Sequence, residues 1–256
     1  MLTLSRMVPY RPRSTPSSLS SRFTGHILKL LFPWSCAACG TELPEVDDQG
    51  FCAACDLRLP RVQGLVCIRC GVPLPYGGMW CYGCRRSPMG LRVRAALLYK
   101  DGIPSAVYRF KYSGRLSLAE PFADRMAAIY AKQFPDPVDL LIPVPLHGRT
   151  ERQRGFNQAA LLAAALSRRL NIPWRSDILK RSRPTKAQHA LDRQSRRQNL
   201  EDAFEVGAID PTVVRGKSIV LIDDVCTTGS TFEHCARVLK PLNPRRIQGY
   251  ALARDE

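Results

Sequence analysis

From residue 91 onward, the apolar positions follow two alternating patterns. Short apolar runs rich in Val, Ile and Leu predict strands buried on both faces, as in a parallel sheet. Between them, apolar residues recur every three or four positions, which predicts helices that pack on that sheet. We expect strands at 93–99, 139–142, 178–179, 219–222 and 247–253, and helices at 105–112, 116–134, 157–170 and 232–240. The pattern predicts an α/β domain over residues 91–256.

The first 90 residues lack this alternation. Residues 1–21 are rich in Ser, Arg and Pro and have no periodicity, which predicts a disordered basic tail. Residues 22–32 have the apolar spacing of a short amphipathic helix. We therefore divide residues 22–90 into this helix and a small cysteine-rich domain.

Eight of the ten cysteines fall in Cys-x-x-Cys pairs. Two pairs complete a tetrahedral site of four thiolates, so the pairs predict two structural zinc ions. Gly40 and Gly71 each follow a pair, where the turn around a metal favours a residue without a side chain. Sequential pairing keeps each site local, as in a double zinc ribbon, and interleaved pairing is the alternative. The pairs are Cys36/Cys39, Cys52/Cys55, Cys67/Cys70 and Cys81/Cys84.

The stretch from 219 to 231 carries the clearest candidate chemistry. Asp223 and Asp224 follow its apolar strand, and a loop of small, hydroxyl-bearing residues then enters a helix. Ligands of open α/β sheets bind beyond the carboxyl ends of the strands. Free N–H groups at a helix start suit a phosphate, and adjacent carboxylates suit ribose hydroxyls or a hydrated Mg²⁺. The stretch predicts a sugar-phosphate site with the loop Thr227, Thr228, Gly229, Ser230 and Thr231.

A second anion site is predicted after the strand at 139–142. Pro143 and Pro145 end that strand because proline cannot donate a ladder hydrogen bond. The next segment, 147–155, reads as a loop suited to a pyrophosphate. Residues 180–200 are basic and poor in aliphatic side chains, which indicates a mobile lid over the phosphates. The arginines of the 147–155 loop are Arg149, Arg152 and Arg154.

The chain carries a formal net charge of +16, which indicates a polyanionic partner or substrate. The excess is concentrated in residues 151–200, where twelve Lys and Arg face three Asp and Glu. This excess of positive charge is larger than a solvated surface requires, so we expect the segment to bind phosphate groups.

The sequence also bears on location. No apolar run approaches the ~20 residues of a membrane span, and the N-terminal residues lack the apolar segment of a secretory signal. Cysteine pairs that bind metal fit a reducing compartment. We expect a cytoplasmic protein.

The stretch from Ile219 to Thr231 resembles the phosphoribosyl-pyrophosphate (PRPP) motif of type I phosphoribosyltransferases. The resemblance implies that Asp223 and Asp224 hold the ribose hydroxyls and that the loop at 227–231 wraps the 5′-phosphate. It implies PRPP bound with Mg²⁺. The residues expected at the pyrophosphate or in the lid are Arg152, Arg154, Gln188, Arg196 and Lys111.

With its zinc pairs, the chain from Cys36 to Arg254 is similar to the ComF family of competence-associated proteins, which includes GntX-like members. The resemblance implies a phosphoribosyltransferase-like fold and a link to the uptake of single-stranded DNA. Cys226 departs from the aliphatic residue usual in the motif, and Asn243 serves a turn that usually contains Gly. Further motifs that carry the resemblance are Phe110-Lys111-Tyr112, Pro143-Val144-Pro145 and Arg154-Gly155-Phe156-Asn157-Gln158.

Two functions, which do not exclude each other, fit the sequence better than a purely structural adaptor, because the carboxylates and the phosphate loop are intact. As an enzyme, the protein would be a phosphoribosyltransferase, a glycosyltransferase acting on pentosyl groups, and would release pyrophosphate; the sequence does not identify its acceptor. As a binding module, it would use the fold as a scaffold or PRPP sensor. Its basic segment and zinc ribbon would then bind single-stranded DNA mainly through charge.

Overall fold

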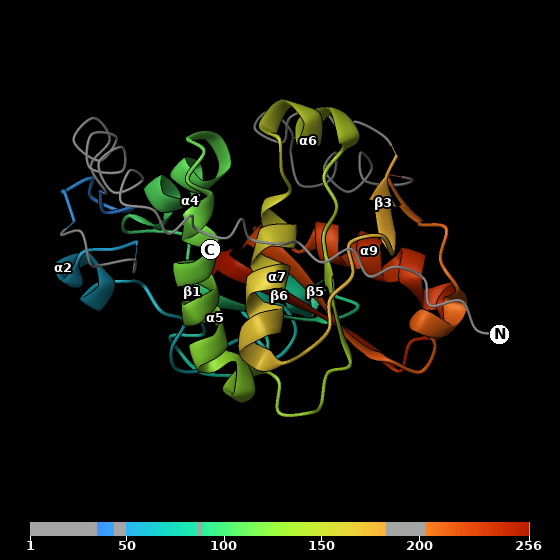
Figure 1. The fold of residues 1–256 in the computed structure, drawn as a ribbon. Coiled ribbons are helices and arrows are strands. Elements are labelled where there is room, and N and C mark those ends of the chain that lie inside the picture. The colour runs from blue at the N-terminus through green and yellow to red at the C-terminus, as the bar shows by residue number, and fades with distance from the viewer. Residues whose placement is uncertain (1–34, 44–49, 87–88, 183–202, 256) are drawn as a thin grey trace, which may run out of the picture.

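The computed structural model describes residues 35–43, 50–86, 89–182 and 203–255. At its centre lies a parallel sheet of four strands in the order β1-β6-β5-β2 (Figure 1). This confirms the predicted parallel α/β fold. The predicted tail at 1–21, the helix at 22–32 and most of the lid at 180–200 lie outside the described residues. The strands are β1 (Arg92–Leu98), β2 (Leu140–Pro143), β5 (Ser218–Cys226) and β6 (Arg246–Arg254).

Helices cover both faces of this sheet. Helices α4, α5 and α7 share one apolar core with Val220 and Ile222 of β5. Helix α9 shares a second core with Ile219 and Leu221, whose side chains point to the opposite face because strand residues alternate. The helices are α4 (Ile103–Tyr112), α5 (Ala119–Gln133), α7 (Gln158–Leu170) and α9 (Ser230–Leu239), and a 3-10 turn, η1 (Leu116–Leu118), precedes α5.

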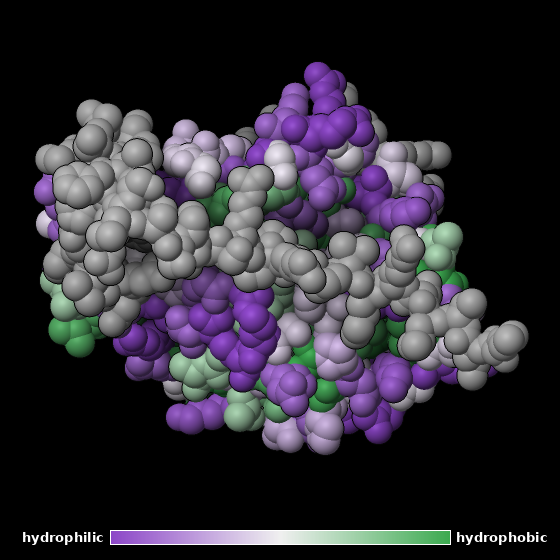
Figure 2. All heavy atoms as spheres, viewed as in Figure 1, coloured by the Kyte–Doolittle hydropathy of each residue, from purple (hydrophilic) through white to green (hydrophobic). Residues whose placement is uncertain are grey.

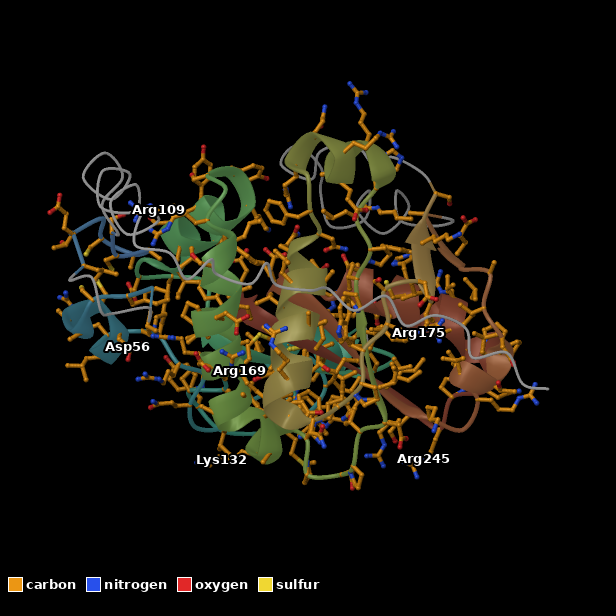
Figure 3. All side chains as sticks on the ribbon, in the orientation of Figure 1. Asp56, Arg109, Lys132, Arg169, Arg175 and Arg245 are labelled. Atoms are coloured by element: carbon orange, nitrogen blue, oxygen red, sulfur yellow. The ribbon has the colours of Figure 1, made fainter. Side chains whose placement is uncertain are left out.

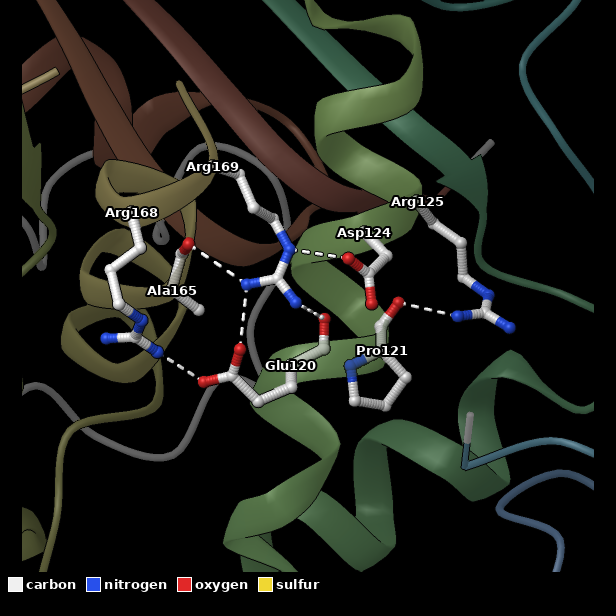
Figure 4. Close-up of polar contacts among 7 residues, drawn as sticks. All are labelled: Glu120, Pro121, Asp124, Arg125, Ala165, Arg168 and Arg169. Atoms are coloured by element: carbon white, nitrogen blue, oxygen red, sulfur yellow. Dashed lines mark hydrogen bonds and ion pairs between the residues drawn. The ribbon is translucent and has the colours of Figure 1, made fainter. Parts of the chain in front are cut away.

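Charged residues join α5 to α7 in front of the sheet (Figure 4). Arg169 of α7 lies between two acidic residues of α5, and its Nη1 donates to Glu120 Oε2 at 2.7 Å. Its Nε donates to Asp124, and Arg168 pairs with Glu120 as well. The pairing fixes the two helices that cover the face where Asp224 lies.

The cysteine-rich segment contains two short helices, α2 (Ala53–Leu57) and α3 (Tyr82–Arg86). Residues 60–62 between its halves pair with the free edge of β1. The first half, with Asp56, lies beside α4, with Arg109 (Figure 3). Arg109 of α4 donates to the Cys36 carbonyl, and Arg125 of α5 donates to Asp56. The second half joins the α9 face, and Cys67 belongs to that core.

The structure corrects two expectations. The segment 147–155 is a helix, α6 (Gly148–Arg154), because His147 caps its first turn and Gly155 ends it with φ +83°. The strand expected at 219–222 runs on to Cys226 as β5, because β6 pairs with it as far as Arg254. Asp223 and Asp224 therefore lie within the strand.

Shorter elements complete the fold. An antiparallel pair, β3 (Leu179–Arg181) and β4 (Phe204–Val206), lies beside α9, and the sequence predicted only its first strand. The turns η3 (Pro211–Val213) and η4 (Lys240–Leu242) flank β5 and α9. Asn243 has φ +53°, as the turn chemistry predicted. Among the described residues, no helix combines the length and apolar character needed to cross a membrane.

Candidate functional site

The eight paired cysteines form two groups of four, in sequential order along the chain. In each group all four sulfurs lie within 4.8 Å of one another. Between neighbouring pairs the Sγ–Sγ distances are 3.9 Å for Cys39 and Cys52 and 3.6 Å for Cys70 and Cys81. Zinc–sulfur bonds of about 2.3 Å in a tetrahedron require about 3.8 Å. Both groups therefore fit structural zinc, and the interleaved pairing is excluded.

The turns around these sulfurs have the predicted geometry. Gly40 and Gly71 have φ values of +83° and +75°, which residues other than glycine rarely adopt. The remaining cysteines, Cys226 and Cys235, are buried thiols far along the chain from both groups.

The two acidic residues of β5 lie beyond the end of the neighbouring strand. β2 ends at Pro143, which pairs with Ile222, whereas Asp223 pairs with Ala251 of β6 on the other side. Ligands of open α/β sheets bind outside the carboxyl ends of the strands. Both aspartates therefore lie near the carboxyl edge of the sheet, past the end of β2.

Asp224 is 2% exposed as a whole residue, and its carboxylate lies on the α7 face of the sheet. It forms an ion pair with Lys111, the penultimate residue of α4, and accepts a hydrogen bond from Gln158 Nε2 at 3.3 Å. Burial by itself raises the pKa of Asp224, but the Lys111 ammonium outweighs it, and the net pKa lies below its usual value. Asp224 is therefore a charged group with its counterion built in.

Asp223 occupies the alternate position and faces the α9 side. It is half-buried, and its Oδ1 accepts from the Asp224 backbone N–H at 2.8 Å. Burial, and next the Asp224 carboxylate, hold the pKa of Asp223 well above its usual range. Burial lowers the pKa of Arg181 in β3, and the Asp223 charge acts in the opposite direction. Asp223 is therefore the more exposed acid of the pair.

The loop after β5 is a tight turn of small, hydroxyl-bearing residues that leads into α9. Thr227 is exposed, whereas Thr228 is partly exposed. Gly229 has φ +82° at the N-cap of α9. The Thr228 hydroxyl lies 2.8 Å from the Ser230 hydroxyl and accepts from the Ser230 N–H at 3.3 Å. The backbone N–H groups of the first turn of α9 thus lie next to small polar side chains.

Helix α6 follows β2 and lies at the top of the molecule, where hydrophilic residues gather (Figure 2). Arg154 donates to Gln158 Oε1, and its guanidinium carbon lies 4.9 Å from the Tyr112 ring centre. Arg154 therefore joins the network of Lys111 and Asp224, whereas Arg152 is exposed. The predicted residues Gln188 and Arg196 lie outside the described residues.

Sequence reasoning missed two members of this constellation. Gln158 has the polar signal of a residue that opens a helix after the Asn157 cap, yet its contact with Asp224 depends on tertiary packing. Arg181 lies in a short strand among many other basic residues, and nothing in the sequence distinguishes it.

Comparisons with known proteins agree with this architecture. The double zinc ribbon domain family matches residues 27–85, and the phosphoribosyl transferase domain family matches residues 157–256. The fold and the site thus define a phosphoribosyltransferase-like protein with an N-terminal double zinc ribbon. The division at residue 90 stays a prediction.

Relatives with similar sequences extend along nearly the whole chain. The DNA utilization protein YhgH of Escherichia coli K12 is 30% identical over 88% of this chain and 99% of its own length. Competence protein F of Haemophilus influenzae is 32% identical over 87% of this chain and 98% of its own length. Competence protein ComFC of Bacillus subtilis is 30% identical over 75% and 78%. The chain belongs to the ComF family of these proteins.

Solved structures with a related fold are more distant. An adenine phosphoribosyltransferase shares 14% identity at a TM-score of 0.36, over 59% of this chain and 75% of that one. The Bacillus subtilis glutamine PRPP amidotransferase shares 15% identity at a TM-score of 0.37, over 57% and 30%. Likeness at this level carries no weight for function.

Proposed function

We propose that the protein binds Mg²⁺–PRPP at the end of β5 and transfers its phosphoribose to an acceptor, with release of pyrophosphate. The observation that carries the proposal is that Asp223 lies past the last residue of β2, near the end of β5, and that the Thr228–Ser230 turn leads from this strand into α9. A carboxylate and a helix start at one sheet edge suit a sugar and its phosphate. By its relatives' names, we place this activity in DNA utilization or competence, within the cytoplasm.

In this proposal each residue has a distinct task. Asp223 accepts from the ribose hydroxyls, and the N–H and hydroxyl groups of the loop at 227–231 hold the 5′-phosphate. Asp224, paired with Lys111, holds the end of β5 against α4 at the edge of this site. Arg152 and Arg154 on α6 attract the leaving pyrophosphate.

The proposed transfer breaks one bond and forms one bond at ribose C1. The bond from ribose C1 to the pyrophosphate oxygen breaks, and C1 bonds to a nucleophilic nitrogen or oxygen of the acceptor. The acceptor then loses its proton to solvent. Since the phosphate loop and α6 follow different strands, the geometry separates the retained phosphate from the departing pyrophosphate.

Pyrophosphate release tests the catalytic part. Mg²⁺–PRPP is incubated with the protein and a panel of nucleobases, amines and oligonucleotides. We expect release with at least one acceptor class and none from Asp223→Asn. A protein that binds PRPP but releases no pyrophosphate with any acceptor would be a PRPP sensor instead.

A second candidate function, binding of single-stranded DNA, has an observation of its own. The second zinc ribbon exposes Tyr76 and Tyr82 at 101% and 74%. Arg86 lies 5.7 Å from the Tyr82 ring centre, and Arg69 lies 5.3 Å from that of Trp80. Exposed rings with arginines suit stacked bases and a phosphate backbone.

Fluorescence titration of a labelled oligothymidine at several salt concentrations tests this candidate. We expect affinity to fall steeply with salt, and to fall in Tyr82→Ala relative to the exposed control Leu57→Ala on the first ribbon. An affinity that does not change with salt concentration, or that is the same in both variants as in wild type, would contradict DNA binding at this surface.

A further inference from the structure

The segment that joins the second zinc ribbon to β1 lies directly on the candidate phosphate loop. A Cβ added to Gly229 would overlap Met89 Cε and would lie 3.2 Å from its Sδ. The methyl group of Met89 therefore occupies the space that a side chain at position 229 would take. Met89 is 5% exposed, so the contact is shielded from water.

The next residue of that segment holds the helix that follows the loop. The backbone N–H of Gly90 donates to Glu233 Oε1 at 3.0 Å. Glu233 belongs to the first turn of α9. An apolar contact and a hydrogen bond thus tie residues 89–90 to both sides of the loop's exit into α9.

These two residues are in turn held by the zinc site. Arg69 lies between the ligands Cys67 and Cys70, and its Nη1 donates to the Met89 carbonyl at 2.9 Å. The Arg69 carbonyl accepts from the Val93 N–H of β1 at 2.7 Å. A continuous set of contacts therefore runs from the metal-binding turn through Arg69 and Met89 to Gly229.

The first zinc site has different neighbours. Its Ala38 lies against Gly102, where an added Cβ would approach Ala38 Cβ to 2.7 Å, and its Cys36 carbonyl accepts from Arg109. Both contacts are made with the α4 segment. Within the described residues, the cysteine-rich segment contacts Gly229 and Glu233 through residues 89–90, which follow the second zinc site.

We propose that Met89 is a positioning residue of the phosphate loop, through which the second zinc site holds that loop ready for a sugar phosphate. The ligand named here rests on the proposed function. Gly229 lies in the left-handed region, and glycine has more conformational freedom than any other residue, so an unsupported loop would lose conformational order. Met89 reduces that freedom before the ligand arrives, which strengthens binding.

Hydrogen exchange and ligand titration together test the coupling. Met89→Ala is compared with Met79→Ala, a matched control because Met79 is an exposed methionine of the same ribbon. We expect Met89→Ala to speed amide exchange at residues 227–233 while it keeps two zinc ions. We also expect Met89→Ala to lower the affinity for ribose 5-phosphate about tenfold and to leave the affinity for pyrophosphate unchanged. Met79→Ala should behave as wild type, and Met89→Leu should restore most of the affinity.

The outcomes separate the two proposals. Unchanged exchange at 227–233 in Met89→Ala, or equal loss of ribose 5-phosphate and pyrophosphate affinity, would overturn the positioning role. If wild type binds no ribose 5-phosphate, the proposed function fails, and the exchange data alone then decide whether the zinc ribbon orders the loop.

Discussion

Lys111 Nζ and Asp224 Oδ2 form an ion pair inside the protein, with side-chain exposures of 20% and 3%. The pair joins the end of α4 to β5 at the candidate site. Desolvation works against both charges, yet each holds the other ionised: the net pKa of Lys111 is raised and that of Asp224 is lowered. Removing one member of such a pair lowers the stability of the fold, because the other charge stays buried without a partner.

The first prediction concerns this pair. We expect Asp224→Asn and Lys111→Met each to lower the free energy of unfolding by about 3 kcal/mol, since each leaves one buried charge alone. The double variant should lose less than the sum of the two, by about 2 kcal/mol. Urea unfolding of the four proteins measures this. Additive losses would mean that the pair contributes no coupling.

The second prediction concerns Asp223, whose pKa burial and Asp224 raise. A carboxyl with a raised folded pKa favours folding while it is protonated, so its contribution fades as pH rises from about 4 through the folded pKa. Asp223→Asn keeps an oxygen acceptor for the Asp224 N–H and removes the charge. We expect its Tm to exceed that of wild type by about 2 °C at pH 8, and the gap to close toward pH 4.

Scanning calorimetry of both proteins over roughly pH 4 to 8 measures this gap, with Glu205→Gln of β4, exposed in the structure, as control. A gap that widens as the pH falls would contradict the raised pKa of Asp223.

The third prediction concerns zinc. We expect two zinc ions per chain by elemental analysis, one in Cys84→Ala, and two in the control Cys235→Ala, whose thiol lies outside both groups. Cys84→Ala should also lower Tm more than an average single substitution, since Cys84 belongs to the core that contains α9. Two ions remaining in Cys84→Ala would contradict the grouping of the sulfurs.

The fourth prediction concerns Gly229 and Met89. Alanine at 229 must adopt a left-handed conformation and displace the Met89 methyl, and we expect Gly229→Ala to reduce the unfolding free energy by about 2 kcal/mol. In the Met89→Ala background the added loss should fall to about 1 kcal/mol, because only the conformational part remains. Chemical denaturation of the four proteins checks this. The same added loss in both backgrounds would show that Met89 does not crowd position 229.

The parallel sheet and the zinc sites could be predicted because their signals are local. Apolar runs fix the strands, and the spacing of the cysteines fixes the ligand pairs. The Asn157 cap was also predictable, and its side chain accepts from Ala159 N at 2.9 Å. The α6 helix was missed although its signals, His147 and Gly155, stand in the sequence, because the arginines between them suggested a loop.

The rest depends on tertiary contacts. That Lys111 reaches Asp224, and that Met89 covers Gly229, follows only once α4 and the ribbon are placed against the sheet. The extension of β5 through both aspartates likewise depends on β6 as a partner. A single sequence carries no local signal for such pairings.

Calorimetric titration of Mg²⁺–PRPP into wild type, Asp223→Asn and the Glu205→Gln control tests the central claim most directly. Asp223 is the better target of the two acids, because the loss of Asp224 would leave the buried Lys111 charge without its partner. We predict saturable binding by wild type and Glu205→Gln, and at least a tenfold loss, about 1.4 kcal/mol, in Asp223→Asn. No binding by a wild-type protein that carries two zinc ions, or equal binding by Asp223→Asn, would contradict a phosphoribose site at the end of β5.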